Sequence, residues 1–582
     1  MRRLIVLALA TVVALLVLAA CGGDDDSAAP PPAPAAEPEP APAEPAPEPA
    51  PAEPEPAPAE PEPAPEPAPE PPPEEPSEAR DTLAIAVQEL GMTLETSTYQ
   101  AASMLVLQAT QEPLVVYTPR EVEGSDVPVF DNTQFEPGVA ESWEIDESAP
   151  SITLTLREGV QSPYGNTLTA EDVKWTVERN IALESFGAGF AFSQACVDFE
   201  NPLTVVDELT VTFNLTAICP NLFRILNWHW ESPYDSVEAQ AHATEDDPWA
   251  TEWLTTNSAS YGPYNIEDFT PGQSVTLVAN PNYWQGEVPI KRIVIRVVPD
   301  PGNRQQLLES GEVQYVPDLP RVQLEELAGN PDVKVENARN TRMLYVVTNN
   351  NVEPFDNPLV RQAIAYAIPY EDLNTTSYKG TATLASGPVS PLLQHHDASL
   401  WQYTYDPDRA KELLAEAGLA DGFDATLQYS LSNPGPENAQ VAVQIQSALR
   451  EVGINVELEQ ATSDAVLFSE LLEKKVPFGL GGTAPFVPDA AYQLVNTGTA
   501  TGPSAFSAYA GEEFEQLAIA ASGNADDASR GDQIGQAQEI WAQDMPMIPV
   551  LEPNIGLAMD PALTGYVQQP TGFPYLGLFR YE

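Results

Sequence analysis

The fold is decided by the stretch Pro137-Gly138-Val139-Ala140-Glu141-Ser142-Trp143-Glu144-Ile145 and by the segments that come after it, Ile152-Thr153-Leu154-Thr155-Leu156-Arg157 and Thr169-Ala170-Glu171-Asp172-Val173. In the second segment apolar and polar residues alternate, which is the pattern of a half-buried strand. In the third, Thr169 and Asp172 stand at the spacing of a capping box, so a helix is expected after Thr169. Ala170, Val173 and Val177 would share one face of that helix.

Strands and helices alternate on both sides of this block. Residues 83–87 are predicted to form a first strand, and residues 114–117 a strand or helix end after a helical stretch around 101–111. Further on, a strand over 425–430, a helix over 437–450 and alternation at Ile454, Val456 and Leu458 predict a β–α–β unit. Such a unit crosses over right-handed and pairs its strands in parallel, so the pattern indicates an α/β fold.

Residues 137–178 resemble the signature of the substrate-binding lipoproteins of ABC importers, of the oligopeptide, dipeptide and nickel type, the bacterial extracellular solute-binding protein family 5. Further segments that resemble the family are Gly262-Pro263-Tyr264, Val278–Trp284, Leu307–Glu312, Pro354–Ala363 and Asp406–Gly418. Together these matches cover about residues 81–582. The resemblance implies an α/β, two-lobed periplasmic-binding-protein-like (type II) fold, with an extra subdomain inserted in lobe one and an interlobe ligand cleft.

The domain boundaries that the resemblance implies can be placed along the chain. We expect a signal peptide at 1–20, a lipidated cysteine and tether at 21–80, lobe one at 81–128, 262–340 and 546–582, the inserted subdomain at 129–261, and lobe two at 341–545. The chain would cross between the lobes near 339–351 and again near 545–551, and these crossings are the candidate hinges.

The N-terminus has the pattern of a lipoprotein signal peptide. Arg2 and Arg3 give a positive start, residues 4–18 are apolar, and Leu18-Ala19-Ala20-Cys21 looks like a lipobox. Cys21 is therefore the expected site of lipidation. The alternative is an uncleaved membrane anchor, although the apolar run is at the short end of the ~20 residues needed to span a bilayer. Either way the chain lies outside the cytoplasm, at the outer face of the membrane, in the periplasm or cell-wall space.

The segment after Cys21 consists almost entirely of Ala, Pro and Glu as far as residue 78. It has too few apolar residues to bury, so no fold is expected there. In polyproline II geometry, at about 3.1 Å per residue, it would reach on the order of 150 Å. The composition therefore predicts an extended tether.

The charge of the folded part excludes one class of partner. Of the 86 acidic residues, 16 lie in residues 1–80 and 70 lie beyond, and of the 25 Lys and Arg, 3 lie in residues 1–80 and 22 beyond. This excess of negative charge argues against nucleic acid as a partner.

Cys196 and Cys219 remain as an even pair outside the cytoplasm, so we predict that they form a disulfide; two buried free thiols are the alternative.

A binding protein of this design needs a cleft between two lobes and no catalytic residue. The expected partners are a small-molecule or peptide ligand, the permease subunits of the transporter and the membrane through the lipid anchor, with no cofactor, no metal and a monomeric state. In the segment Thr341–Asn350, which resembles the crossing strand of the family, Tyr345 corresponds to an aromatic that faces the ligand, and Arg342 lies beside it. Tyr345 as a core residue of the strand is the alternative.

The family's peptide binders carry an aspartate that holds the peptide's α-amino group, in a segment that corresponds to Gly481–Asp489. Here Pro485 stands at the aspartate position and Gly482 at a tryptophan position, with Phe486 next to them. Loss of the anion removes a charge-assisted contact, which places ordinary peptide binding in doubt. Asp489 is expected to cap the helix after it. The resulting wall would suit a sugar ring or a bulky, partly apolar solute, with Phe486 as a stacking face.

Other readings of the sequence remain open. Further aromatic candidates for ligand contact are Tyr99, Trp228, Trp230 and Trp401, although the sequence favours a packing role for each of them. Nickel binding would depend on the four histidines, His229, His242, His395 and His396, which do not form a ligand pattern. No catalytic motif of a hydrolase, metalloprotease or nucleotide-binding enzyme is present. A tethered sensor with the same fold, not coupled to import, is a further alternative.

Overall fold

The computed structural model describes residues 80–97, 101–185, 188, 192–228, 231–317, 319–431, 433, 435–500, 502–570 and 572–582. The expected signal peptide, Cys21 and the tether lie outside these residues, and so do Tyr99, His229 and Trp230. The chain divides into two units, 1–74 and 75–582, and all of the described residues belong to the second. Within the described residues no helix combines the length and apolar character needed to cross a bilayer.

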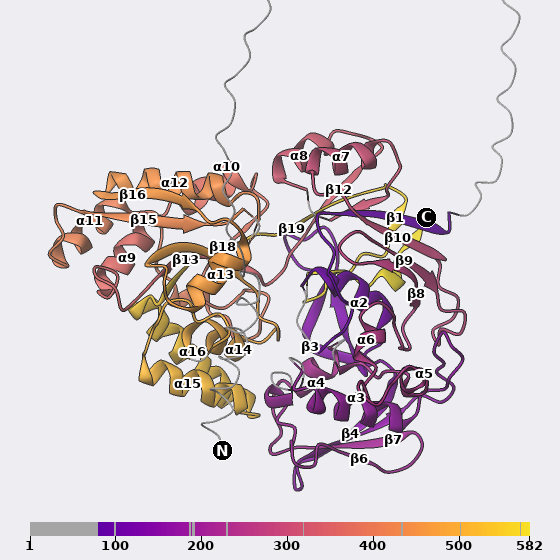
Figure 1. Ribbon diagram of the computed structural model, residues 1–582. Coiled ribbons are helices and arrows are strands. Elements are labelled where there is room, and N and C mark those ends of the chain that lie inside the picture. Colours follow the sequence, from indigo (N-terminus) through magenta and orange to yellow (C-terminus); the bar gives the residue numbers. More distant parts are fainter. Residues whose placement is uncertain are drawn as a thin grey trace, which may run out of the picture. The chain divides into compact units, whose positions relative to one another are not determined.

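The first lobe is built on a mixed seven-stranded sheet with the order β12-β19-β11-β1-β10-β9-β8 (Figure 1). Its strands are β1 Thr82–Val87, β8 Tyr264–Thr270, β9 Ser274–Ala279, β10 Arg292–Val297, β11 Tyr315–Val316, β12 Lys334–Ala338 and β19 Ile555–Met559. β1 pairs in parallel with β10 and β11, and the other pairs are antiparallel. The sheet is formed from separate parts of the chain: β19, from the C-terminal region, lies between β12 and β11, and β11 separates it from β1.

Short helices and hairpins complete the first lobe. They are η1 Ala101–Ser103, α2 Met104–Thr110, α7 Pro301–Glu309, α8 Arg321–Leu327, the hairpin of β2 Val115–Arg120 with β3 Val129–Pro137, and at the C-terminus β20 Leu563–Thr564, η5 Leu576–Leu578 and β21 Arg580–Tyr581. The predicted first strand is confirmed as β1.

The inserted subdomain has its own antiparallel sheet in the order β4-β5-β7-β6. Its elements are β4 Ala140–Asp146, β5 Ser151–Leu156, α3 Ala170–Ala182, β6 Leu203–Val205, β7 Thr210–Asn214, α4 Leu222–Leu226, α5 Ser236–Ala241 and α6 Thr251–Leu254. The alternation in β5 is confirmed, since Ile152, Leu154 and Leu156 are buried. The predicted capping box is also confirmed: Asp172 accepts a hydrogen bond from the Thr169 backbone N–H at 2.7 Å.

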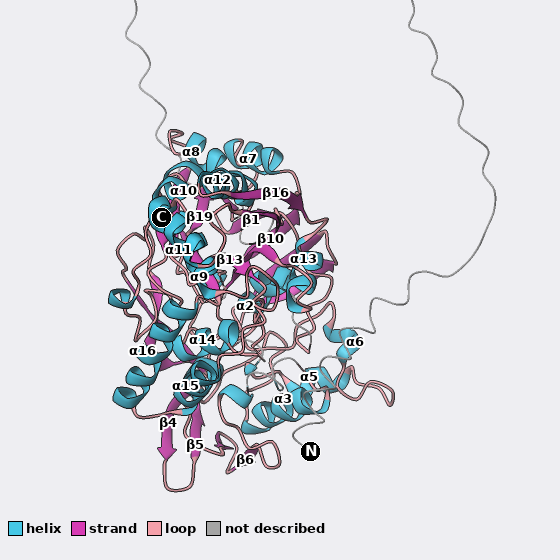
Figure 2. Ribbon diagram, turned by 90° about the vertical axis from the view of Figure 1, so that its left-hand side faces the viewer, coloured by secondary structure: helices cyan, strands magenta, loops and turns pink. Residues whose placement is uncertain are grey.

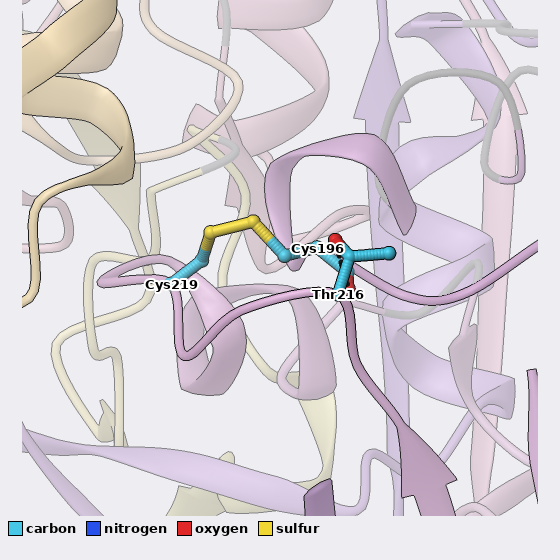
Figure 3. The surroundings of a disulfide bond; sticks show 3 residues. All are labelled: Cys196, Thr216 and Cys219. Atoms are coloured by element: carbon cyan, nitrogen blue, oxygen red, sulfur yellow. Dashed lines mark hydrogen bonds between the residues drawn. A yellow bond between two sulfur atoms is a disulfide. The ribbon is translucent and has the colours of Figure 1, made fainter. Parts of the chain in front are cut away.

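The predicted disulfide between Cys196 and Cys219 is present in this subdomain (Figure 3). The backbone N–H of Thr216 donates to the carbonyl oxygen of Cys196 at 2.8 Å. The disulfide therefore links the segment before β6 to the segment before α4.

The second lobe is built on a six-stranded sheet with the order β14-β18-β13-β17-β15-β16. Its strands are β13 Met343–Thr348, β14 Thr383–Leu384, β15 Phe423–Tyr429, β16 Ile454–Gln460, β17 Phe478–Thr483 and β18 Met547–Glu552. The helices around it are α9 Pro358–Ala367, α10 Tyr370–Ser377, η4 Ala398–Leu400, α11 Pro407–Glu416, α12 Asn438–Glu451, α13 Asp464–Leu472, α14 Ala490–Gly498, α15 Glu512–Gly523 and α16 Asp527–Asp544 (Figure 2). β15 and β16 pair in parallel around α12, as the β–α–β pattern predicts.

One predicted domain boundary disagrees with the observed strand pairing. The sequence places residues 546–582 in lobe one, but β18 pairs antiparallel with β13 and belongs to the second sheet. Met547, Ile548, Val550 and Leu551 are all buried there. The chain returns to the first sheet only with β19.

Candidate ligand-binding site

Two of the predicted site residues, Arg342 and Gly482, are joined through a third that the sequence patterns did not identify. The Arg342 guanidinium donates from Nη1 to Oδ1 of Asn433 at 3.1 Å, and Asn433 Nδ2 donates to the carbonyl oxygen of Gly482 at 3.0 Å. Arg342 precedes β13, Asn433 follows β15 and Gly482 lies in β17. Three neighbouring strands of the second sheet therefore place these groups together, with Arg342 only partly buried.

A small cavity lies against this group. Its lining residues are Asn433, Asp464, Leu467, Phe468, Leu471, Leu480, Gly481, Gly482 and Phe506. The Ser430 hydroxyl donates to Oδ1 of Asp464 at 2.8 Å at one side, and apolar side chains form the rest. Gly481 and Gly482 lie in the buried strand β17, and a Cβ at Gly481 would already lie 3.4 Å from Val347 and 3.5 Å from Leu471. We refer to Arg342, Asn433 and Gly482 with this cavity as the second-lobe wall.

Tyr345 lies inside the core of the second lobe. Its exposed fraction is 0 %, and it pairs across the strands with Gly481. It packs in the cluster formed with Leu494, Phe506 and Trp541, and burial raises the pKa of its phenol above the ordinary value. The structure therefore places Tyr345 behind the second-lobe wall.

Phe486 lies where the second lobe meets the inserted subdomain. The indole N–H of Trp228 donates to its carbonyl oxygen at 3.1 Å, and its ring packs against the core cluster of the first lobe. Val487, the next residue, is fully buried in that same cluster. Of the other aromatic candidates, Trp401 is half-buried and packs beside Tyr403 with ring centroids 4.9 Å apart. Phe486 and Trp228 are thus brought together across the two lobes, whereas Trp401 stays within the second.

Asp489 caps α14, as predicted, by accepting from the backbone N–H of Tyr492 at 2.9 Å. Its carboxylate also forms an ion pair with Arg530 of α16, and Arg224 of α4 lies 4.0 Å away. Burial raises the pKa of Asp489, but the charges of Arg224 and Arg530 and the bond from Tyr492 outweigh it, so the pKa lies below its usual range. No sequence pattern pointed to either arginine, because neither lies near Asp489 along the chain.

The two arginines, Arg224 and Arg530, line an open groove of about 510 Å³. One side belongs to β3 and the inserted subdomain and the other to the second lobe; the lining residues are Thr133, Gln134, Phe135, Pro220, Arg224, Gln394, Asn524, Ala525, Asp527 and Arg530. Beside the groove, Asn132 Nδ2 donates to the carbonyl oxygen of Pro488 at 3.2 Å. The groove therefore has walls from both lobes, which is the arrangement that an interlobe ligand requires.

The two crossings between the lobes are joined by a buried ion pair. Arg339, which precedes β13, donates to Glu552 at the end of β18 at 3.4 Å, and Glu552 is fully buried. Asn340 Nδ2 donates to the carbonyl oxygen of Pro553 at 2.7 Å. Burial raises the pKa of Glu552 to about 7, against the opposing effects of Ser390 and Arg339. Both crossings therefore run side by side and are fixed to each other.

Two α/β lobes linked by paired crossings, with polar groups of both lobes around a groove, define a two-lobed binding protein. Comparison with known proteins identifies the family of this binding protein. Residues 134–505 match the bacterial extracellular solute-binding proteins, family 5, and the chain belongs to this family. It is therefore the extracytoplasmic solute-binding component of an ABC importer, and its family consists of binding proteins of transporters.

Individual relatives show the range of the family. The heme-binding protein A of Haemophilus influenzae is 28% identical over 463 residues, 76% of this chain and 83% of that protein. The probable D,D-dipeptide-binding periplasmic protein of Escherichia coli is 26% identical over 444 residues, 75% of this chain and 83% of that protein. The fold matches the crystal structure of a dipeptide-binding protein from Pseudoalteromonas in complex with Met-Leu, with a TM-score of 0.73 and 22% identity over 86% of this chain and 100% of that one.

Proposed function

We propose that this chain is a lipid-anchored, monomeric receptor that binds an organic solute between its lobes without chemical change and delivers it to the permease. Cys21 carries the lipid and the tether spaces the lobes from the membrane. The ligand lies against the second-lobe wall, with Arg342, Gly482 and Phe486 among its contacts. The observation that carries this assignment is the bonded series Arg342–Asn433–Gly482, which fixes a partly buried charged group beside the backbone of β17.

The ligand is not held mainly by a free α-amino group. Residues 481–488 contain no acidic side chain, and Pro485 occupies the position at which the family's peptide binders have their aspartate. Asp489 cannot substitute, because it is 2 % exposed and is engaged by Arg530, by the cap of α14 and by the charge of Arg224. The wall instead offers the Arg342 cation, apolar surface and the Asp464 carboxylate, which already accepts from Ser430 at 2.8 Å. This suits a peptide-like or other organic solute that does not depend mainly on an anionic contact there.

The test begins with the ligand itself. Native mass spectrometry of the chain purified from its own membranes identifies the copurifying solute, and calorimetry then measures its dissociation constant for Arg342→Ala and Asn433→Ala. Loss of a charge-assisted contact is expected to weaken binding about 10-fold or more. Arg409→Ala is the matched control, because Arg409 lies on the exposed surface of α11 and its ion pairs among the described residues are with Glu412 and Glu416. Unchanged affinity in both wall variants would contradict the assignment.

Anchoring is tested separately by Cys21→Ala in cells. The variant is expected to lose metabolic labelling with palmitate and to leave the membrane fraction, while its ligand affinity stays unchanged. If the variant remains in the membrane fraction without label, the N-terminal segment acts as an uncleaved anchor instead.

A further inference from the structure

The interlobe groove is lined by two arginines that are largely buried. Arg224 is 6 % exposed and Arg530 4 % exposed, and both line the groove. Arg224 comes from the inserted subdomain and Arg530 from the second lobe, so each lobe contributes one cation.

These two cations share a single buried carboxylate. Asp489 pairs with Arg530 and lies 4.0 Å from Arg224. The remaining bonds of Arg224 go to neutral oxygens, namely the carbonyl groups of Pro220 and Asn132 at 2.7 and 2.9 Å and the side-chain Oδ1 of Asn221 at 3.4 Å. Its Nε is buried without a hydrogen-bond partner among the described residues. Since two guanidinium groups face one carboxylate, this part of the groove has one more positive than negative charge. An unpaired buried charge is unfavourable in free energy, so the site is stabilised when an anion binds there.

The other polar groups of the groove do not cancel this surplus. Asp527 is the remaining carboxylate among the described lining residues, but it lies 68 % exposed at the rim and already accepts from His395 at 2.9 Å and Gln394 at 3.3 Å. Gln134 adds an amide to the wall, whereas the Thr133 hydroxyl already donates to Asp131 at 2.7 Å and the Asn524 amide donates to Gln533 at 3.0 Å. The groove therefore offers a ligand two cations and a neutral amide, which is the chemistry that a carboxylate requires.

We propose that the groove binds a carboxylate group of the transported solute between Arg224 and Arg530. This inference rests on the proposed function and narrows its ligand to anionic organic solutes. Because the two arginines belong to different lobes, a carboxylate held by both interacts better with the closed arrangement than with an open one, and its binding favours closure. The negative charge of the body does not prevent this, since physiological salt screens exposed charges beyond about 8 Å.

The test compares two small probes that differ in charge, succinate and succinamide, at constant ionic strength. Thermal unfolding of the full chain is expected to shift upward in a saturable manner with succinate and not with succinamide. Arg224→Gln should weaken the apparent succinate affinity at least 10-fold, and Asp527→Asn should strengthen it. Equal shifts for the two probes, no shift with either, or an unchanged response in Arg224→Gln would overturn the proposal.

A second variant keeps the test valid if Arg224→Gln fails to fold. Gln134 is exposed on the groove wall, so Gln134→Glu adds a negative charge without disturbing the core and is expected to abolish the succinate shift. The matched control Gln240→Glu makes the same change on the exposed face of α5, outside the groove, and should leave the shift intact. Arg342 does not line the groove, so a failure here leaves the second-lobe wall standing. Native-ligand affinity that is unchanged in both Arg342→Ala and Asn433→Ala, while the succinate response persists, would contradict the wall assignment and not the groove.

Discussion

Trp228 of the inserted subdomain donates its indole N–H to the carbonyl oxygen of Phe486 in the second lobe at 3.1 Å. The acceptor lies four residues after Gly482, within the same segment that forms the second-lobe wall. Next to it, Val487 is buried in the core cluster of the first lobe. The segment 482–487 therefore links the candidate ligand surface directly to the opposite lobe.

Replacement of Trp228 by Phe removes this donor while keeping an aromatic ring. The loss of one interlobe hydrogen bond is expected to disfavour closure by about 1 kcal/mol. The dissociation constant of the native ligand should therefore be roughly 5-fold larger. Small-angle scattering of the ligand-saturated chain and calorimetry measure the two effects. Trp143→Phe, which alters an aromatic side chain packed against Phe223 within the inserted subdomain, is the control and should leave affinity unchanged.

Asp489 is expected to be among the most sensitive positions for stability. Asp489→Ala removes a helix cap and leaves the buried Arg530 unpaired, so we expect a loss of about 3–5 kcal/mol in the free energy of unfolding. Asp406→Ala is a matched control, because Asp406 caps α11 in the same way, with Arg409 N–H at 2.9 Å, but is exposed; its loss should be about 1 kcal/mol. Denaturant unfolding compares the two, and similar losses would contradict the role of the buried ion pair.

The pH dependence of the same group has a defined sign. The pKa of Asp489 is lowered in the folded state, so its contribution to stability is present above the ordinary value of 3.8 and is lost as pH falls below it. Wild-type stability should therefore fall more steeply than that of Asp489→Ala in the acid range below about pH 4. Parallel acid unfolding curves would show that the ionised carboxylate does not stabilise the fold.

Local patterns predicted the elements of this fold well, because they depend on neighbours along the chain. The alternation of Ile152, Leu154 and Leu156 and the capping pair Thr169 and Asp172 specify β5 and the start of α3 without long-range information. The predicted domain boundary at residue 546 differs from the strand pairing because the position of β18 depends on contacts that are distant in the sequence. Its sequence is apolar throughout most of its length, so it is compatible with either sheet, and only the pairing with β13 decides between them.

The site was less predictable, because its contacts join residues far apart in the sequence. Arg342 and Gly482 were identified through the resemblance, but Asn433, which connects them, carries no local signal. Arg224 and Asp489 are likewise separated by most of the second lobe, and no periodic pattern relates them. Tyr345 lies in a strand in which all six residues are buried, so alternation could not show which face it would take.

The disulfide is expected to stabilise the inserted subdomain. Cys196 and Cys219 close a loop with a sequence separation of 23, for which chain entropy predicts a contribution of about 3 kcal/mol. The double variant Cys196→Ser with Cys219→Ser should lose stability by that order and should no longer respond to reducing agent. Differential scanning calorimetry with and without reductant measures this, and an unchanged transition in reduced wild type would contradict it.

The last prediction concerns three buried carboxyl groups outside the candidate site. Burial raises the pKa of Glu112 to about 8, although Trp284 Nε1 at 3.0 Å and Tyr283 Oη at 3.2 Å donate to it and act in the opposite direction. Burial likewise raises the pKa of Glu231 to about 8 and that of Glu552 to about 7. Between about pH 5 and pH 8 the folded state therefore holds protons that the unfolded state releases, and stability must fall as pH rises, by up to about 1.4 kcal/mol per pH unit for each group.

Glu112→Gln keeps a neutral acceptor for Trp284 and Tyr283 but removes the proton equilibrium. The variant should show a shallower decline of the free energy of unfolding between about pH 5 and pH 8 than the wild type, and should be the more stable of the two at the alkaline end. Glu158→Gln, at an exposed turn, is the control and should follow the wild-type curve. Denaturant titrations of the ligand-free chain across this range measure the slopes. A variant curve parallel to the wild type would show that Glu112 is ionised in the folded state, held by its two aromatic donors despite its burial.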